Sequence, residues 1–170
     1  MQACSTDRLY HYLLDPAPDV LDGIRTHGLL PLSHQPRTAG RGFEERLAFY
    51  RALYVEWAQQ LIGRPYENSG IFLTPIDFRL LSHPSMARCP RVTVPLQALD
   101  RELSFLTWVE GESRVVRPLS REGLEEAARR WPADQVIQWF GRIRTMLFFY
   151  VPQVVTYQAR IVVQPDWIEA

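Results

Sequence analysis

The sequence predicts one α+β domain, and three observations support this fold class. A chain of 170 residues lies within the range of about 100–200 residues that is typical of one domain, so we expect residues 1–170 to form a single domain. Apolar residues make up 46% of the chain, which is enough for a substantial core. Strand-like segments lie at both ends with helical patterns mostly between them, which favours α+β over regularly alternating α/β.

The first part of the chain predicts a buried strand followed by a short helix. Residues 9–14 form an apolar run rich in aromatic side chains, which is typical of a strand. Asp19 is placed to cap the next helix with its carboxylate, and Gly28 is placed to end it. Residues 33–42 are rich in Ser, Pro, Thr and Gly and predict a loop.

The middle of the chain predicts a long helix and then mostly strands. Apolar residues recur at spacings of three and four from Phe43 to Leu61, which indicates one amphipathic helix over residues 43–62. Ser120 is placed to cap a helix that runs to about Trp131. Further runs predict strands at residues 71–74, 92–96, 103–109, 115–116, 145–157 and 160–163, a helical turn at 78–81 and a helix at 134–143.

Composition excludes several classes of protein and leaves others open. The formal net charge is zero, so the field of the whole molecule does not favour strong non-specific binding to nucleic acid or to anionic lipid. No apolar run approaches the roughly 18 residues that a membrane helix needs, and the N-terminus lacks the pattern of a secretory signal. With two isolated cysteines as well, we expect a cytoplasmic protein without a membrane partner.

Standard catalytic and metal-binding motifs are absent from the sequence. It contains no GxSxG, Walker, HExxH or GxGxxG pattern. None of the four histidines lies three or four residues from another, and the two cysteines form no CxxC pair. We therefore expect no metal site.

Two early segments resemble the ADP-ribosyltransferase-like superfamily. The first is Leu9-Tyr10-His11, followed by a helix and then His27-Gly28-Leu29-Leu30-Pro31. In that superfamily an aromatic–His pair on the first strand precedes such a helix, and the histidine binds the ribose of NAD. The resemblance implies that His11, with the adjacent Tyr12, belongs to an NAD site. The superfamily usually has Thr or Ser two places after the histidine, where this chain has Leu13.

A middle segment, Ser69-Gly70-Ile71-Phe72-Leu73-Thr74, resembles the Gly-Ile-aromatic strand of the poly(ADP-ribose) polymerase and diphtheria-toxin branches. There, two aromatic rings enclose nicotinamide. The resemblance implies Phe72 as the first ring, with Thr74 on the same strand. An ungapped match puts His83 at the second ring, and Phe78 is the nearest aromatic residue.

A late segment, Val151-Pro152-Gln153-Val154-Val155, resembles the strand that supplies the catalytic glutamate in several branches, including DNA-modifying toxins. This chain has Gln153 at that place, which can accept a hydrogen bond but carries no negative charge. RNA 2′-phosphotransferases, another branch, work without that glutamate. The pyrophosphate of NAD would suit guanidinium groups, and Arg37 and Arg41 lie in the loop after the first helix.

Together the segments imply an ADP-ribosyltransferase-like split β-sheet core with flanking helices. They imply a protein, such as a bacterial toxin or modifying enzyme, that binds NAD or an ADP-ribose-like group and could transfer ADP-ribose to a nucleic acid, a protein or a small molecule. Two alternatives stay open: an inactive binding or regulatory domain on the same fold, and an unrelated α+β interaction domain. We expect the first, middle and last motif strands to be neighbours, with His11, Phe72 and Gln153 facing one cleft.

Overall fold

The protein is α+β, as the sequence predicts, and its strands form two antiparallel sheets. The structure is a computed structural model that describes residues 2–13, 16–35, 43–63, 68–81, 86, 88–142 and 150–170. The first sheet has the order β1 (Arg8–Tyr12), β3 (Arg91–Pro95), β7 (Ile168–Glu169). The second has the order β2 (Ile71–Leu73), β6 (Gln153–Thr156), β4 (Ser104–Glu110), β5 (Ser113–Pro118).

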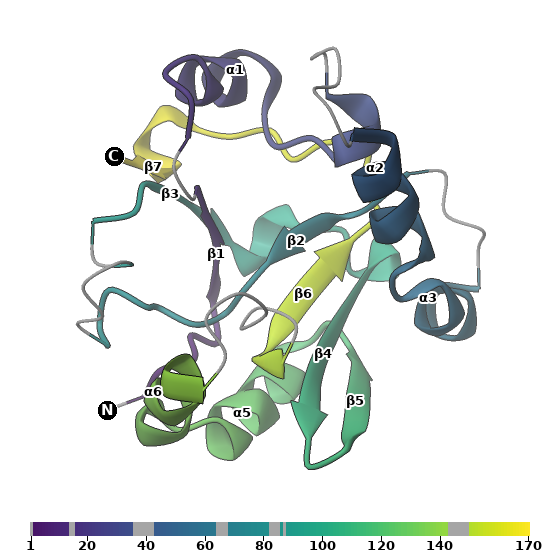
Figure 1. The fold of residues 1–170 in the computed structure, drawn as a ribbon, viewed down its shortest axis with the longest axis vertical. Coiled ribbons are helices and arrows are strands. Elements are labelled where there is room, and N and C mark those ends of the chain that lie inside the picture. Colours follow the sequence, from purple (N-terminus) through teal and green to yellow (C-terminus); the bar gives the residue numbers. More distant parts are fainter. Residues whose placement is uncertain are drawn as a thin grey trace.

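The helices pack around these sheets (Figure 1). The α-helices are α1 (Val20–His27), α2 (Phe43–Ala52), α3 (Val55–Ile62), α5 (Arg121–Arg130) and α6 (Ala133–Arg142). Short 3-10 helices are η1 (Leu32–His34), η2 (Leu96–Ala98), η3 (Arg101–Leu103) and η4 (Pro165–Trp167). None of the helices among the described residues is long and apolar enough to cross a membrane.

The two sheets meet where β1 passes β2. Tyr10 and Thr74 form an isolated antiparallel bridge, with hydrogen bonds of 2.8 and 2.9 Å between their backbone groups. On its other edge β2 pairs with β6, where Phe72 lies opposite Val155. The middle strand β2 is therefore a neighbour of both β1 and β6, as expected, but the three strands belong to two sheets rather than one central sheet.

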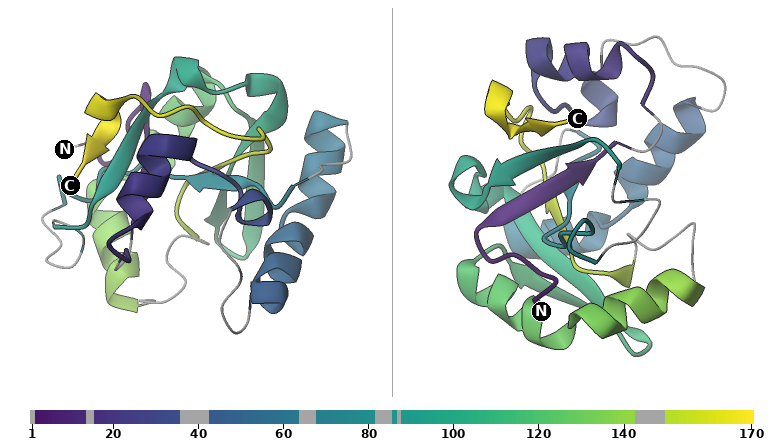
Figure 2. Two further views of the ribbon diagram at one scale, coloured as in Figure 1. Left: turned by 90° about the horizontal axis from the view of Figure 1, so that it is seen from above. Right: turned by 90° about the vertical axis from the view of Figure 1, so that its left-hand side faces the viewer.

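Successive side chains along the strands of the second sheet point to opposite faces, and each face packs in a different apolar cluster. Leu106, Trp108 and Val154 point to one face and pack in the main core, which α5 and α6 cover. The opposite face bears a second cluster, which consists of Tyr54, Ala58, Phe105, Val155 and Tyr157. Figures 1 and 2 show α2 and α3 on this side of the sheet and α5 and α6 on the other.

Two of the three helix-end signals act as the sequence predicts. The Ser120 hydroxyl accepts a hydrogen bond of 2.9 Å from the Gly123 backbone N–H and so caps α5. Gly28 ends α1 with a φ of 79°, and its backbone N–H donates to the Ile24 carbonyl oxygen. Asp19 lies at the N-cap of α1, but its side chain makes no capping hydrogen bond, so its predicted role is wrong.

The long helix predicted over residues 43–62 is wrong, because the chain forms two helices there. The helix α2 ends at Ala52 and α3 begins at Val55, and Tyr54 between them has a left-handed backbone with φ 63°. The Tyr54 side chain is 6% exposed, and its ring lies edge-on to Phe105 at 5.9 Å between centroids. Burial of this side chain outweighs the local preference for a continuous helix. Leu61, predicted on the apolar face, is exposed.

The C-terminal strands are shorter than the sequence predicts. Within the segment 145–157, residues 145–149 lie outside the described residues, and Tyr150 is helical. The strand β6 begins only after Pro152, at Gln153. Ile161 makes an isolated bridge with Leu29 rather than a strand. The strand β7, which pairs with β3 through Arg91 and Val92, has no counterpart among the predicted strands.

Candidate functional site

Beyond the bridge between Tyr10 and Thr74, the His11 side chain rather than the backbone of β1 contacts β2. We call this place, formed by Tyr10, His11, Phe72 and Thr74, the β1–β2 junction. His11 Nδ1 lies 2.8 Å from the Phe72 carbonyl oxygen. A carbonyl oxygen can only accept, so Nδ1 carries the hydrogen, and Nε2 of the neutral ring is left as an acceptor.

His11 is held in this neutral form. Burial lowers the pKa of the His11 imidazole, and the hydrogen bond to Phe72 only partly opposes that effect. The ring is therefore uncharged at neutral pH. Among the described residues no hydrogen bond engages Nε2. The junction thus presents one acceptor nitrogen in a partly buried setting.

Phe72 and Gln153 lie on the same face of the second sheet. Phe72 is paired with Val155, and Gln153 is two residues before Val155, so all three side chains point to one side. Diagonal neighbours on adjacent strands lie roughly 7–8 Å apart. Gln153 is 9% exposed, and Phe72 is half-buried. Both side chains therefore lie on the face of the sheet that carries the second apolar cluster.

Tyr54 connects these two residues. Its hydroxyl donates a hydrogen bond of 3.1 Å to Gln153 Oε1, and its ring lies 6.3 Å from the Phe72 ring. Burial raises the pKa of Tyr54 to about 12, so the phenol stays protonated and remains a donor at neutral pH. The sequence places Tyr54 only on an apolar helix face and gives no signal for this contact.

Arg114 on β5 adds positive charge beside Tyr54. Its Cζ lies 5.0 Å from the centre of the Tyr54 ring, and its Nη1 donates to Thr107 Oγ1 at 3.1 Å. Thr107 is the cross-strand partner of Gln153. Burial lowers the pKa of Arg114, but an arginine stays charged at neutral pH. The surroundings of Gln153 therefore offer hydrogen-bond donors and a cation.

Three other residues with predicted roles in the cofactor site are engaged elsewhere. Thr74 Oγ1 donates to the Pro152 carbonyl oxygen at 2.9 Å, and its side chain is buried. Phe78 is 0% exposed and lies in the main core, so its ring has no face open to a ligand. The Tyr12 hydroxyl accepts from the backbone N–H of Phe78 and donates to the Ile76 carbonyl oxygen. The side chains of these three residues are therefore occupied by contacts within the protein.

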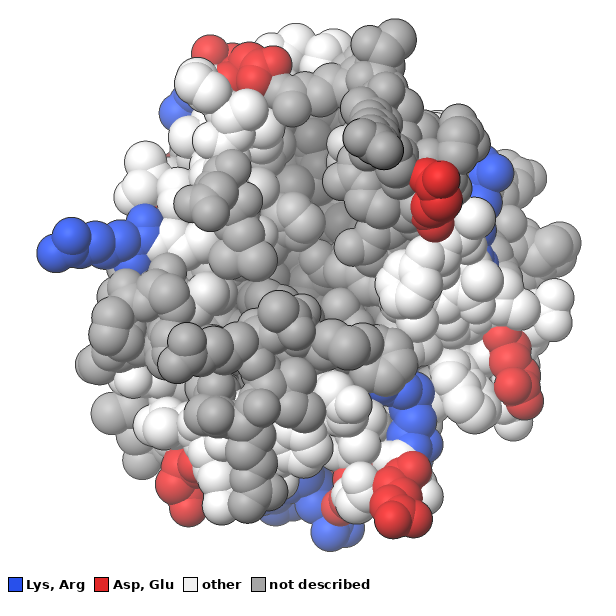
Figure 3. Space-filling view, viewed as in Figure 1, with Lys and Arg blue, Asp and Glu red and all other residues white. Residues whose placement is uncertain are grey.

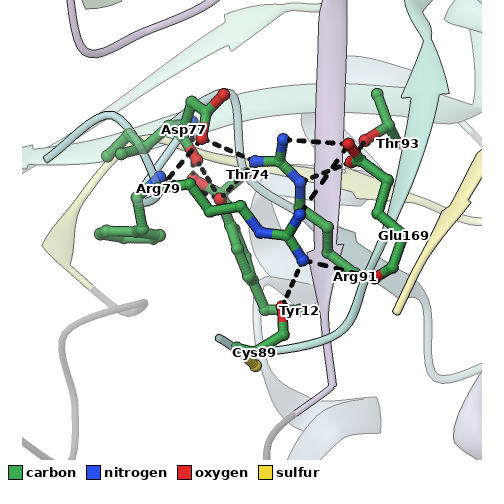
Figure 4. A network of polar contacts seen from close by, with 10 residues as sticks. Tyr12, Thr74, Asp77, Arg79, Cys89, Arg91, Thr93 and Glu169 are labelled. Atoms are coloured by element: carbon green, nitrogen blue, oxygen red, sulfur yellow. Dashed lines mark hydrogen bonds and ion pairs between the residues drawn. The ribbon is translucent and has the colours of Figure 1, made fainter. Parts of the chain in front are cut away.

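Tyr12 belongs instead to a polar network centred on Arg91 (Figure 4). Arg91 Nη1 bonds to Asp77 Oδ1, and Arg91 Nε bonds to Glu169 Oε2, both at 2.6 Å. The side chain of Arg91 is 9% exposed, and its guanidinium lies over the Tyr10 ring at 4.4 Å. Burial lowers the pKa of Arg91, but the bonds to Glu169 and Asp77 outweigh this and raise the pKa overall. This network ties β3 to β7.

The remaining predicted residues, Arg37, Arg41 and His83, lie outside the described residues. On the face seen in Figure 3, the acidic and basic side chains of the described residues are scattered around the edge and form no large patch of one sign.

Among the described residues, no three His, Cys, Asp or Glu side chains gather closely enough to hold a metal ion.

Contacts thus link residues of β1, β2, β5 and β6 with Tyr54 between α2 and α3. These residues supply an acceptor at His11, an aromatic ring, an amide at Gln153 and a guanidinium at Arg114. Comparisons with protein-family models, curated proteins and solved structures give no match to this chain.

Proposed function

We propose that the chain is an ADP-ribosyltransferase-like protein that binds NAD or an ADP-ribose-like group beside the β1–β2 junction. The hydrogen bond from His11 to the Phe72 carbonyl oxygen carries the proposal, because it leaves a neutral imidazole with an acceptor nitrogen. Such an acceptor suits a ribose hydroxyl, the group that the resemblance implies for this histidine.

The arrangement of the strands supports the same proposal. The segments that resemble the superfamily lie on β1, β2 and β6, which are adjacent strands of two sheets joined at Tyr10–Thr74. An aromatic ring, an acceptor and an amide on neighbouring strands match the mostly apolar lining with a few polar groups that is typical of ligand sites. A split sheet of this superfamily would have the same neighbours.

The charge near Gln153 favours binding over transfer. Transfer of ADP-ribose passes through a cationic ribose, which a carboxylate would stabilise. This chain has a neutral amide at that place, with the Arg114 guanidinium nearby. An inactive binding or regulatory protein on the same fold is therefore the second candidate. If neither NAD nor ADP-ribose binds, the remaining hypothesis is an unrelated interaction domain.

Replacing His11 with alanine should weaken NAD binding about ten- to hundred-fold, because the ribose hydroxyl loses its acceptor. Isothermal titration calorimetry with NAD and with ADP-ribose measures the loss. His27→Ala is the matched control, since His27 is exposed on α1. Equal affinity in the His11 variant and the parent would remove His11 from the site, and no binding by the parent would refute the proposal.

Replacing Gln153 with glutamate should raise the rate of nicotinamide release from NAD on the order of 10²-fold, if ribose binds beside this residue. The new carboxylate can still accept the Tyr54 hydrogen bond, and the Arg114 cation, which contacts Tyr54 and Thr107, favours the charged form. Chromatography of the products measures release, with exposed Gln59→Glu as control. A folded variant that binds NAD without releasing nicotinamide would argue for the binding candidate alone.

A further inference from the structure

Tyr54 is held in an unusual conformation to reach Gln153. It is a non-glycine residue with φ 63° among the described residues, where left-handed backbone is rare for bulky side chains. Strain of this kind persists only when surrounding contacts enforce it, and it gathers at functional sites. Here the enforcing contacts are burial against Phe105 and the hydrogen bond to Gln153.

The Tyr54 hydrogen bond fixes which end of the Gln153 amide faces a ligand. The phenol is always a donor at neutral pH, because burial raises its pKa to about 12. It therefore pairs with Oε1, and the amide NH₂ group points away from it. Among the described residues, no hydrogen bond engages Gln153 Nε2, although the side chain is only 9% exposed. Gln153 Nε2 is not among the fully buried polar atoms of the described residues that lack a partner, so its N–H groups stay accessible to an oxygen acceptor from a ligand.

We infer that Tyr54 positions Gln153 as a hydrogen-bond donor, and that this makes the site select ADP-ribose over NAD. The inference rests on the proposed function. The two ligands differ at the anomeric carbon of the distal ribose, where ADP-ribose has a hydroxyl and NAD has a cationic nicotinamide. The hydroxyl oxygen can accept from Gln153 Nε2, whereas the nicotinamide ring nitrogen cannot. The positive charge of Arg114 against the Tyr54 ring also disfavours a second cation.

A double-mutant cycle tests the inference on the full chain. Calorimetry gives the dissociation constants of ADP-ribose and NAD for the parent, Tyr54→Phe, Gln153→Ala and the double variant. The parent should prefer ADP-ribose about three- to ten-fold, the effect of one hydrogen bond. Tyr54→Phe keeps the ring but frees the amide to rotate, so the preference should fall toward one. In the Gln153→Ala background the same change should have no further effect on the preference.

A second phenol provides the matched control. Tyr157 lies in the same buried cluster, and Tyr157→Phe removes a hydroxyl that makes no hydrogen bond to Gln153. This variant should keep the preference of the parent. The inference is overturned if Tyr54→Phe leaves the preference unchanged, or if it reduces the preference equally without Gln153. Binding of both ligands that depends on His11 but not on Tyr54 would refute only this inference, whereas absence of binding by the parent would refute the proposed function as well.

Discussion

Replacing Gly28 with alanine should lower the free energy of unfolding by about 3 kcal/mol or more. Gly28 has φ 79° and ψ −170°, a backbone region that is essentially restricted to glycine. A Cβ built there would lie 2.3 Å from the Ile161 carbonyl oxygen, far inside normal contact. That oxygen accepts a hydrogen bond from Leu29, so the clash would push apart a contact between distant segments. Urea denaturation followed by circular dichroism measures the loss.

Gly63 is the matched control for this prediction. It also follows a helix, α3, with φ 69°, but a Cβ there would meet nothing within 4 Å. Gly63→Ala should therefore incur only the strain of a left-handed residue, about 1–2 kcal/mol. If the two variants lost equal stability, the close approach of Ile161 would not be the cause.

Replacing Arg91 with methionine should destabilise the fold by about 3–5 kcal/mol, because it leaves the largely buried Asp77 carboxylate without its cation. Asp77 and Glu169 both bond to this guanidinium, and the Asp77 side chain is 13% exposed. Thermal and urea unfolding measure the effect. The comparison variant is Arg25→Met, which removes an exposed ion pair with Asp22 and should change stability by less than about 1 kcal/mol. A loss as small as that of Arg25→Met would show that the network contributes little.

Local signals in the sequence identified most of the elements that the structure contains. The strand at His11, the cap at Ser120 and the stop at Gly28 each depend on residues within a few positions, so they could be predicted. The break at Tyr54 could not, since its side chain is buried against residues that are distant in sequence, such as Phe105 and Gln153. Tertiary burial outweighed helix propensity there.

In the candidate site, too, local patterns predict some features, whereas contacts between distant residues could not be predicted. Period-two alternation could have separated His11 from Tyr12, because adjacent residues of a strand point to opposite faces. It cannot show that the Thr74 hydroxyl is taken by the Pro152 carbonyl oxygen. Arg114 carries no motif and reaches the site only through the pairing of β5 with β4. Its position depends on the sheet order, which the sequence does not encode locally.

The first sheet also governs when the protein can fold during synthesis. The strand β1 emerges early, but its ladder partner β3 is encoded much later, with Tyr12 opposite Arg91. The bond between Arg91 and Glu169 spans a further 78 residues. Contacts this distant in sequence slow folding, because a long loop must close before they form. The apolar strand β1 therefore lacks its ladder partner until β3 has been synthesised, and an unpaired strand edge is prone to aggregation.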